Sequence, residues 1–264
     1  MPEGDTILKA ARVLHRALAG ATVTRFEPRT VPATRPIAVG HTTIVRVDAA
    51  GKHLLMRFSD GFVLRTHMRM SGAWHLYRHG ERWRARSHTV RMVIETADWV
   101  AIAVNVPVIA WVRERDLARL APIVHLGPDV LADDFDIDDV IRRARVRPDA
   151  TVADALLDQT VLAGVGNVFK SEILFASRCA PFALVSALTD SRLRAVFEMA
   201  REQMRANVAP GRDRRATTGR MRHDENLWVY RRAGLACRVC GGTIDMRRSG
   251  PDVRSTYWCP SCQR

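Results

Sequence analysis

Residues 162–174 read LAGVGNVFKSEIL and decide how the second half of the chain folds. Apolar residues at helical spacing lead into them, and glycines at positions 164 and 166 then interrupt the pattern. Asn167 follows, where its side chain can cap a second helix that continues through Phe175. The stretch therefore predicts two helices joined by a tight turn. Backbone N–H groups at such a turn can hold a phosphate, and Lys170 adds charge one helical turn further on.

The chain on either side of this turn divides into regions of different periodicity. We expect an N-terminal domain over 1–115, a charged linker over 116–150, a helical domain over 151–235 and a zinc finger over 236–264. A third helix is expected over 191–206, followed by a basic stretch, 210–222, without apolar periodicity that we expect to be mobile or ordered by a partner. Clustered aspartates over 133–139 suit a solvated helix start better than a metal site.

The N-terminal domain combines one helix with period-two segments. Apolar residues at 7, 11, 14 and 18 predict the helix, and Gly20 stands where it should stop. Alternating segments follow over 43–48, 54–58, 62–66, 89–95 and 99–104, with a Gly51–Lys52 turn after the first. Residues 66–74 are expected to form a loop. The predicted fold class is α+β in two domains, the first a β-meander closed into a sandwich or flattened barrel.

Four of the five cysteines form one motif near the C-terminus. Cys237-x2-Cys240 and Cys259-x2-Cys262 are separated by eighteen residues, which is typical of one structural Zn²⁺ held by four thiolates. An iron–sulfur cluster and redox thiols are the alternatives. Arg254 lies between the two pairs, where it could grip a phosphate or be an ordinary surface arginine. Cys179 is expected to be a buried apolar residue.

The net charge points to an anionic partner. Lysine and arginine number 41 against 28 acidic residues, which gives +13 and a sequence pI near 10.7. Nucleic acid is the first candidate, and a solvated basic surface is the alternative. No signal peptide or membrane span is expected, because Glu3 and Asp5 occupy the start and the longest apolar stretch is short and interrupted. We expect a soluble, cytoplasmic protein with no membrane partner.

The first residues, Met-Pro-Glu-Gly-Asp, suit nucleophilic chemistry. Removal of Met1 would leave Pro2 as a secondary amine with a reference pKa of about 8, partly unprotonated at neutral pH. The adjoining helix dipole disfavours the protonated amine and favours an ionised Glu3. The plain alternative is that Pro2 only starts the helix, for which its fixed φ is suitable.

Taken together, these motifs resemble the formamidopyrimidine-DNA glycosylase and endonuclease VIII family of base-excision repair enzymes. The likeness includes the Pro-Glu-Gly start, the Gly-Lys turn, the stretch 162–174 and the four-cysteine finger with its internal arginine, in this order. It implies a β-sandwich with a flanking helix, a helix–two-turns–helix domain and a finger hairpin. The Pro-Glu-Gly-Asp start resembles the endonuclease VIII branch, which acts mainly on oxidised pyrimidines.

The resemblance implies roles for individual residues. Pro2 would attack C1′ of the damaged nucleoside, Glu3 would move protons, and Lys52 and Arg254 would assist catalysis through phosphate contacts. Asn167 and Lys170 would bind DNA from the helical domain. In the loop, Arg69 and Met70 would fill the gap left by the flipped base, with Met70 the better wedge. Ser71 replaces the larger residue of that branch, and core packing is the alternative for Met70.

The expected function is therefore a DNA glycosylase with AP-lyase activity. It would remove oxidised bases from double-stranded DNA, act on abasic sites, cleave by β,δ-elimination, and work as a monomer associated with the nucleoid. The alternatives are an oxidised-purine glycosylase and a non-catalytic DNA-binding zinc-finger protein. An RNA-binding zinc ribbon is less suited, because aromatic residues make up only 6% of the chain and offer few stacking surfaces.

Overall fold

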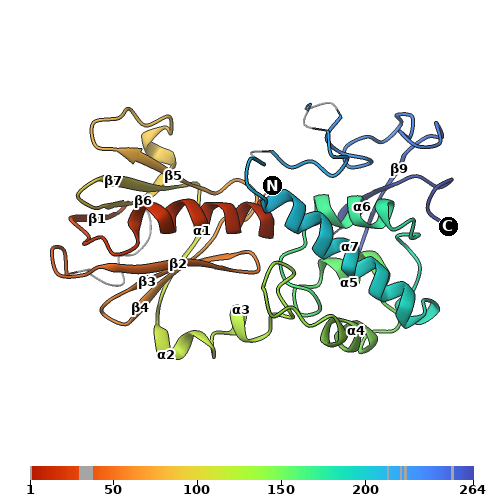
Figure 1. The fold of residues 1–264 in the computed structure, drawn as a ribbon, viewed down its shortest axis with the longest axis horizontal. Helices are drawn as coiled ribbons and strands as arrows, with labels where there is room; N and C mark the ends of the chain where they lie inside the picture. Colours follow the sequence, from red (N-terminus) through yellow and green to blue (C-terminus); the bar gives the residue numbers. More distant parts are fainter. Residues whose placement is uncertain (1, 30–37, 213, 221, 223–224, 251–252) are drawn as a thin grey trace. The chain divides into compact units, whose positions relative to one another are not determined.

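The computed structural model describes residues 2–29, 38–212, 214–220, 222, 225–250 and 253–264. The chain forms two compact units, Met1–Val124 and His125–Arg264. Each unit has its own hydrophobic core, as the α+β two-domain prediction requires. Figure 1 shows the strands β1–β7 in the first unit and the helices α4–α7 in the second. None of the helices in the described residues is long and apolar enough to cross a membrane.

Helix α1 (Gly4–Leu18) opens the first unit. Its apolar stripe is buried, as the sequence predicts, and consists of Ile7, Ala11, Leu14 and Leu18. Full burial of a leucine or isoleucine side chain contributes about 2 kcal/mol, so this stripe fixes the helix on the sheets. The helix ends before Gly20, whose φ of +81° reverses the chain direction without steric cost.

Two four-stranded antiparallel sheets form the rest of this unit. One sheet has the order β2-β3-β4-β8, with bounds β2 Ile44–Ala50, β3 His53–Phe58, β4 Phe62–His67 and β8 Val108–Arg113. The other has the order β1-β6-β7-β5, with bounds β1 Arg25–Pro28, β5 Ala73–Arg78, β6 Val90–Glu95 and β7 Trp99–Val104. A short 3-10 helix, η1 (Ser87–Thr89), leads into β6. The predicted sandwich is confirmed, but the simple meander is wrong.

The departure from a meander has a local cause. Residues 99–112 read as one apolar stretch, yet Asn105 adopts a left-handed φ of +49° and Pro107 has no N–H for a strand ladder. The chain therefore leaves β7 in one sheet and re-enters the other sheet as β8, next to β4. Strand β5 completes the β1-β6-β7-β5 sheet. The sequence instead predicts a loop up to position 74, followed by an arginine-rich segment.

The β2-β3-β4-β8 sheet is covered on both faces. Leu54, Met56 and Leu64 share a core with α1, which packs against β2 and β3. The opposite face carries Leu55 and Val63. Two short helices, α2 (Glu114–Leu117) and α3 (Ala121–Val124), supply the residues that cover this second face.

The second unit is helical around one core. Its helices are α4 (Ile137–Arg145), α5 (Val152–Leu157), α6 (Asn167–Ala176) and α7 (Asp190–Val208), with a 3-10 turn η2 (Val185–Ala187). The hairpin β9 (Asp245–Ser249) and β10 (Arg254–Trp258) follows. Helix α7 confirms the predicted third helix. Helix α4, in the stretch expected to be a linker, contributes Val140 and Ala144 to this core.

The acidic cluster marks the start of α4, as expected. The Asp136 carboxylate accepts hydrogen bonds from the backbone N–H groups of Asp138 and Asp139, at 2.9 and 3.0 Å. This is N-capping, in which a side-chain oxygen satisfies N–H groups that the helix leaves unpaired.

Candidate functional site

The N-terminal residues stand at the start of α1. Glu3 occupies the N-cap position, and its carbonyl accepts from the N–H groups of Thr6 and Ile7 at 2.9 and 3.1 Å. Only 1% of Glu3 is exposed. Pro2 precedes the cap, so it is not the first helical residue that the plain alternative requires. The expected removal of Met1 concerns a residue outside those that the structure describes.

Lys52 lies on the two-residue turn that joins β2 to β3. Ala50 and His53 close this turn as a strand pair, and Gly51 has a φ of +55°. Glycine adopts that left-handed conformation readily, which is why the Gly-Lys pair suits a tight hairpin. The turn places Lys52 at the end of the sheet, as the sequence predicts.

The loop after β4 presents Met70 outward. Met70 is 64% exposed, whereas Met68 is 2% exposed and packs in the core of the first unit. Core packing therefore describes Met68 and not Met70. Arg69 adopts a φ of +50°, a conformation that non-glycine residues seldom take outside functional sites and turns. The Gly72 N–H closes the loop on the Met68 carbonyl at 2.8 Å, and a Cβ on Gly72 would meet that oxygen at 2.5 Å.

Asn167 does not cap α6, contrary to the prediction. Gly166 is the N-cap and Asn167 is the first helical residue. Asn167 is 6% exposed. Its side chain donates to Ser255 Oγ at 3.3 Å and accepts from Lys170 Nζ at 2.8 Å. Its amide thus joins the start of α6 to strand β10, one residue from Arg254.

Lys170 is buried, which corrects its expected direct contact with DNA. It is 1% exposed, and its ammonium group donates to Asn167 Oδ1 at 2.8 Å, to the Ser255 carbonyl at 3.0 Å and to Thr256 Oγ1 at 2.8 Å. An ammonium group has three N–H donors, and three acceptors of the protein lie within hydrogen-bond distance of this one. Lys170 therefore joins Asn167 to β10 in the protein interior.

The turn between α5 and α6 is held by the side chain of Gln159. Gln159 lies beyond the end of α5. Its amide nitrogen donates to the carbonyls of Leu157 and Val165 at 2.7 and 3.0 Å, and its amide oxygen accepts from Gly164 N–H at 3.1 Å. Three bonds from one side chain fix the double turn that leads into Asn167.

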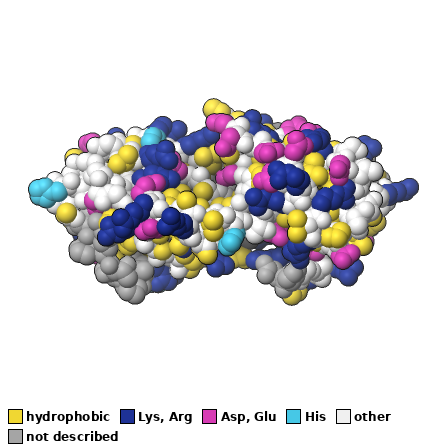
Figure 2. Space-filling view, turned by 90° about the horizontal axis from the view of Figure 1, so that it is seen from below, with side chains coloured by type: hydrophobic (Ala, Val, Ile, Leu, Met, Phe, Trp, Pro, Cys, Tyr) yellow, Lys and Arg dark blue, Asp and Glu magenta, His cyan; other side chains and the backbone are white. Residues whose placement is uncertain are grey.

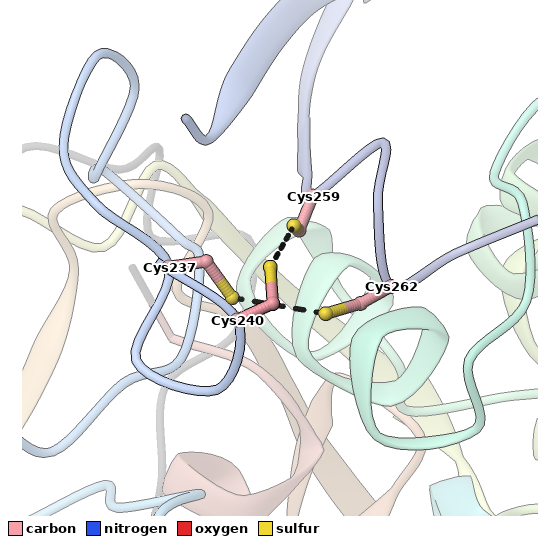
Figure 3. A group of neighbouring side chains, drawn as sticks. All are labelled: Cys237, Cys240, Cys259 and Cys262. Atoms are coloured by element: carbon pink, nitrogen blue, oxygen red, sulfur yellow. Dashed lines mark hydrogen bonds between the residues drawn. The ribbon is translucent and has the colours of Figure 1, made fainter. Parts of the chain in front are cut away.

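The four cysteines of the finger converge on one point, as expected. Their sulfur atoms all lie within 4.8 Å of one another and face each other in Figure 3. The Cys237–Cys262 and Cys240–Cys259 sulfurs are 3.9 and 3.5 Å apart. Four thiolates at about 2.3 Å from a tetrahedral metal ion would be about 3.8 Å apart, so this donor set fits a closed metal site.

Arg254 begins β10, directly after the finger's turn. It is exposed, and Val253 before it has a φ of +51° although valine is β-branched. A Cβ on Gly250, at the other side of the turn, would meet Asp154 Oδ1 at 2.4 Å. Gly250 therefore lies against α5. Arg254 lines a pocket of about 170 Å³ there, together with Arg147, Asp154, Leu157, Asp158, Ser249 and Gly250.

Glu172 is a buried anchoring residue that sequence reasoning missed. It is fully buried, and its carboxylate accepts from the N–H groups of Trp228, Val229 and Tyr230 at 2.7, 2.9 and 2.8 Å, and from the Thr217 hydroxyl. Burial raises the pKa of Glu172, whereas the donated hydrogen bonds lower it. A glutamate inside an apolar helical stretch was the available signal, because a buried charge needs several partners.

The basic stretch 210–222 lacks helix and strand in its described part, as expected, yet its middle is anchored to the rest of the unit. The Asn207 side chain accepts from Ala216 N–H at 2.8 Å and donates to the Ala216 carbonyl at 3.1 Å. Thr217 then donates to Glu172. Positions 213 and 221 lie outside the described residues.

The expected site residues form two groups, one in each unit. In the first unit, the Lys52 turn and the loop with Arg69 and Met70 leave the sheet at the same place, because His53 and His67 are paired across β3 and β4. In the second unit, Asn167 and Lys170 bond to the strand that Arg254 begins. Basic side chains are spread over the face shown in Figure 2, with acidic ones between them.

Comparisons with known proteins cover the whole chain. The sequence models described as the formamidopyrimidine-DNA glycosylase N-terminal domain and H2TH domain match residues 1–106 and 126–218. The chain is 39% identical to the "Probable endonuclease 8 2" of Streptomyces coelicolor over 268 residues, covering 100% of this chain and 94% of that protein. It is also 39% identical to the "DNA-(apurinic or apyrimidinic site) lyase Nei2" of Mycolicibacterium smegmatis, over 100% and 99% of the two chains.

The fold has solved counterparts. A Lactococcus lactis Fpg bound to DNA with an abasic site superposes with a TM-score of 0.83 at 23% identity, over 99% of both chains. The same enzyme bound to DNA with an oxidised pyrimidine gives 0.83 at 22% identity, over 100% of both. On these matches, the chain belongs to the formamidopyrimidine-DNA glycosylase and endonuclease 8 family of DNA glycosylases with AP-lyase activity.

Proposed function

We propose that this enzyme removes oxidised bases, mainly pyrimidines, from double-stranded DNA through a covalent iminium at Pro2, and then cleaves the strand by β,δ-elimination. The observation that supports this proposal most directly is that Pro2 and Glu3 directly precede α1, with Glu3 buried at the positive end of the helix. The enzyme acts as a monomer on DNA with damaged bases or abasic sites. The proposal requires a free amine on Pro2 and hence a chain without Met1.

The chemistry follows from a secondary amine. The Pro2 nitrogen attacks C1′, the N-glycosidic bond breaks, and the base leaves with the bonding electrons and takes up a proton. The sugar ring opens to an iminium that cannot lose its charge by deprotonation at nitrogen. Its positive charge acidifies C2′–H, and loss of that proton expels the 3′ phosphate. Glu3 is the residue placed to carry protons in these steps.

Three side chains are assigned to the phosphates around the lesion. Lys52 approaches from its hairpin turn, Asn167 from the start of α6 and Arg254 from the turn of the finger. Arg254 can bind a phosphate through two N–H groups at once, which a lysine cannot. Lys170 acts behind them by holding Asn167 and β10.

Met70 is assigned to the gap that a flipped base leaves in the duplex. Its exposure at the tip of a closed loop supports this role, and Arg69 beside it can follow the backbone. An apolar side chain that enters the stack restores part of the contact area lost when the base rotates out.

The metal is proposed to be one structural Zn²⁺ per chain. The sulfur spacing matches tetrahedral thiolate coordination, and four protein ligands leave no open position for a reacting molecule. The ion would therefore supply rigidity to the hairpin that carries Arg254. Metal analysis of the purified protein should return one zinc per chain and no iron.

The preference for pyrimidines rests on the Pro-Glu-Gly-Asp start and on 39% identical relatives named endonuclease 8 or Nei2. Oxidised purines are the alternative. A Lactococcus lactis mutant Fpg bound to DNA with Fapy-dG shares the fold with a TM-score of 0.82, but only 22% of its residues are identical. Initial rates on duplexes with one oxidised pyrimidine or one oxidised purine, compared at equal enzyme concentration, decide between the two.

Borohydride trapping tests the mechanism. Protein shown by mass spectrometry to lack Met1 should form a stable covalent adduct with duplex DNA that carries an abasic site. Pro2→Gly should keep some lyase activity, because a primary amine remains, and Lys52→Ala should impair base removal more than cleavage at a pre-made abasic site. Tight DNA binding without any adduct would instead identify a non-catalytic DNA-binding protein.

A further inference from the structure

The second face of the β2-β3-β4-β8 sheet carries buried polar side chains that the proposed chemistry does not use. His53 begins β3 and Arg65 lies in β4, and each residue is 8% exposed. Arg65 Nη1 is 3.2 Å from His53 Nδ1. His53 is paired across the strands with His67, and the two rings meet edge to face with their centroids 4.8 Å apart.

Arg65 depends on His53 for an acceptor. Among the described residues, the Arg65 Nε is buried without a hydrogen-bond partner, and the guanidinium contacts the ring nitrogen of His53 through Nη1. A buried guanidinium is costly unless its donors are satisfied. Because arginine stays protonated in proteins, Nδ1 of His53 must be the acceptor, so His53 is neutral and its other ring nitrogen carries the proton.

The protonation state of His53 agrees with this contact. The Pro122 backbone favours the protonated ring, since proline has no N–H and presents only a carbonyl, but this effect is smaller than the opposing ones. Burial, His67, Arg65 and Arg69 together lower the pKa of His53 to about 3, so this state persists at neutral pH.

His67 extends the contact to the backbone of the loop. Its Nδ1 accepts from the Arg69 N–H at 3.1 Å, so the neutral ring carries its proton on Nε2. Burial and the charges of Arg69, Lys52 and Arg65 lower the pKa of His67 to about 4. Lys52 directly precedes His53 in the chain, and the loop with Met70 directly follows His67. The two rings thus stand between both segments.

We infer that His53, held by Arg65, is a positioning residue for base removal. It fixes the ring of His67, and through that ring the backbone of Arg69. The Lys52 turn and the Met70 loop therefore keep a fixed distance from each other when the enzyme binds DNA. This inference rests on the proposed function and on the roles assigned there to Lys52 and Met70. His53 itself touches neither the sugar nor the base.

Two substitutions separate positioning from simple packing. His53→Phe keeps an aromatic ring against His67 but removes the acceptor for Arg65. His53→Asn removes the ring but offers a carbonyl oxygen to the guanidinium. His75→Phe, an exposed histidine on β5 in the other sheet, is the matched control. Each variant is assayed under single-turnover conditions for base removal from an oxidised-pyrimidine duplex and for cleavage at a pre-made abasic site, with thermal unfolding in parallel.

We expect His53→Phe to slow base removal at least about tenfold while abasic-site cleavage changes by less than about threefold, since small misplacements of positioning groups cost rate at the reacting centre. His53→Asn should regain the thermal stability lost in His53→Phe, because Arg65 again has an acceptor, but it should remain slow in base removal, because no ring then fixes His67. His75→Phe should match the parent. Equal losses on both substrates, or unchanged base removal in His53→Phe, would overturn the inference.

A second variant covers the case in which His53→Phe does not fold. The double variant Arg65→Met with His53→Phe then removes the buried charge together with its acceptor. This variant should still lose base removal selectively, and parent-like base removal would overturn the inference. Borohydride trapping of the parent protein reports on the proposed function separately, because a missing adduct there would refute the Pro2 mechanism whatever the His53 variants do.

Discussion

Glu172 offers the sharpest test of how the second unit is held together. Its substitution by glutamine keeps the size and shape of the side chain but replaces one acceptor oxygen with an NH2 group. In the structure, Oε1 accepts from Val229 and Tyr230, and Oε2 accepts from Trp228 and from the Thr217 hydroxyl. Every donor around the carboxylate therefore meets a changed partner.

The size of the effect follows from the better of two amide orientations. With the amide oxygen at the Oε1 position, both bonds there survive, and the Thr217 hydroxyl can rotate to accept from the new NH2 group. The Trp228 N–H then faces another donor, and one unsatisfied buried N–H costs about 1–3 kcal/mol. The surviving bonds weaken because their acceptor is no longer charged, while the relief of a buried charge offsets part of this. We expect a net destabilisation of about 2–3 kcal/mol.

Hydrogen exchange measures this change where it occurs. The backbone amides of 228–230 should exchange about 30-fold faster in Glu172→Gln than in the parent, because 2 kcal/mol corresponds to roughly that factor. Glu202→Gln, an exposed substitution on α7, is the control and should remain within about 0.5 kcal/mol. Parent-like exchange at 228–230 together with an unchanged midpoint of thermal unfolding would show that the carboxylate does not anchor this segment.

Three further predictions concern the finger and the buried histidines. Lys170→Met should weaken DNA binding about tenfold without changing the salt dependence, whereas Arg254→Ala should lower the slope of log Kd against log salt by about one, as measured by fluorescence anisotropy. Verified removal of the metal should weaken DNA binding, and retained affinity would contradict a role in holding Arg254. Because the folded pKa of His53 is about 3 and the usual value is 6.5, its stabilisation is present above pH 6.5 and lost as the pH falls toward 3. Denaturant unfolding should show that His53→Asn removes about 2 kcal/mol of the difference between pH 7 and pH 5.

Local patterns were sufficient for the elements that carry the expected site. The 3–4 residue spacing of α1, the Gly51–Lys52 hairpin and the cysteine spacing each depend on short-range chemistry, and each appears in the structure as predicted. The stretch 162–174 likewise gives a turn followed by a helix. These features could be read from the sequence because a turn, a stripe or a metal knuckle is decided by residues close together in the chain.

The features that the sequence did not reveal depend on distant partners. Asn167 looked like a helix cap, but its amide is used by Ser255, 88 residues away. Lys170 was expected to contact DNA, but its ammonium group donates hydrogen bonds to the carbonyl of Ser255 and the hydroxyl of Thr256 in the protein interior. The order of the sheets was missed for the same reason, since β8 pairs with β4 and not with its neighbour β7. Periodicity does not report which distant segment a polar group or strand edge will meet.

Helix α6 explains why these polar side chains are buried at all. The finger has a small core of its own, so apolar packing alone gives it little orientation. Polar groups on α6 supply the direction instead: Lys170 binds Ser255 and Thr256, and the Ser171 hydroxyl accepts from Tyr257 N–H at 3.3 Å. Hydrogen bonds are directional where dispersion contacts are not, so they can set the angle at which β10 leaves the helix. We therefore expect that a metal on the four cysteines keeps the hairpin folded, that α6 sets its direction, and that Arg254 keeps its position only when both are intact.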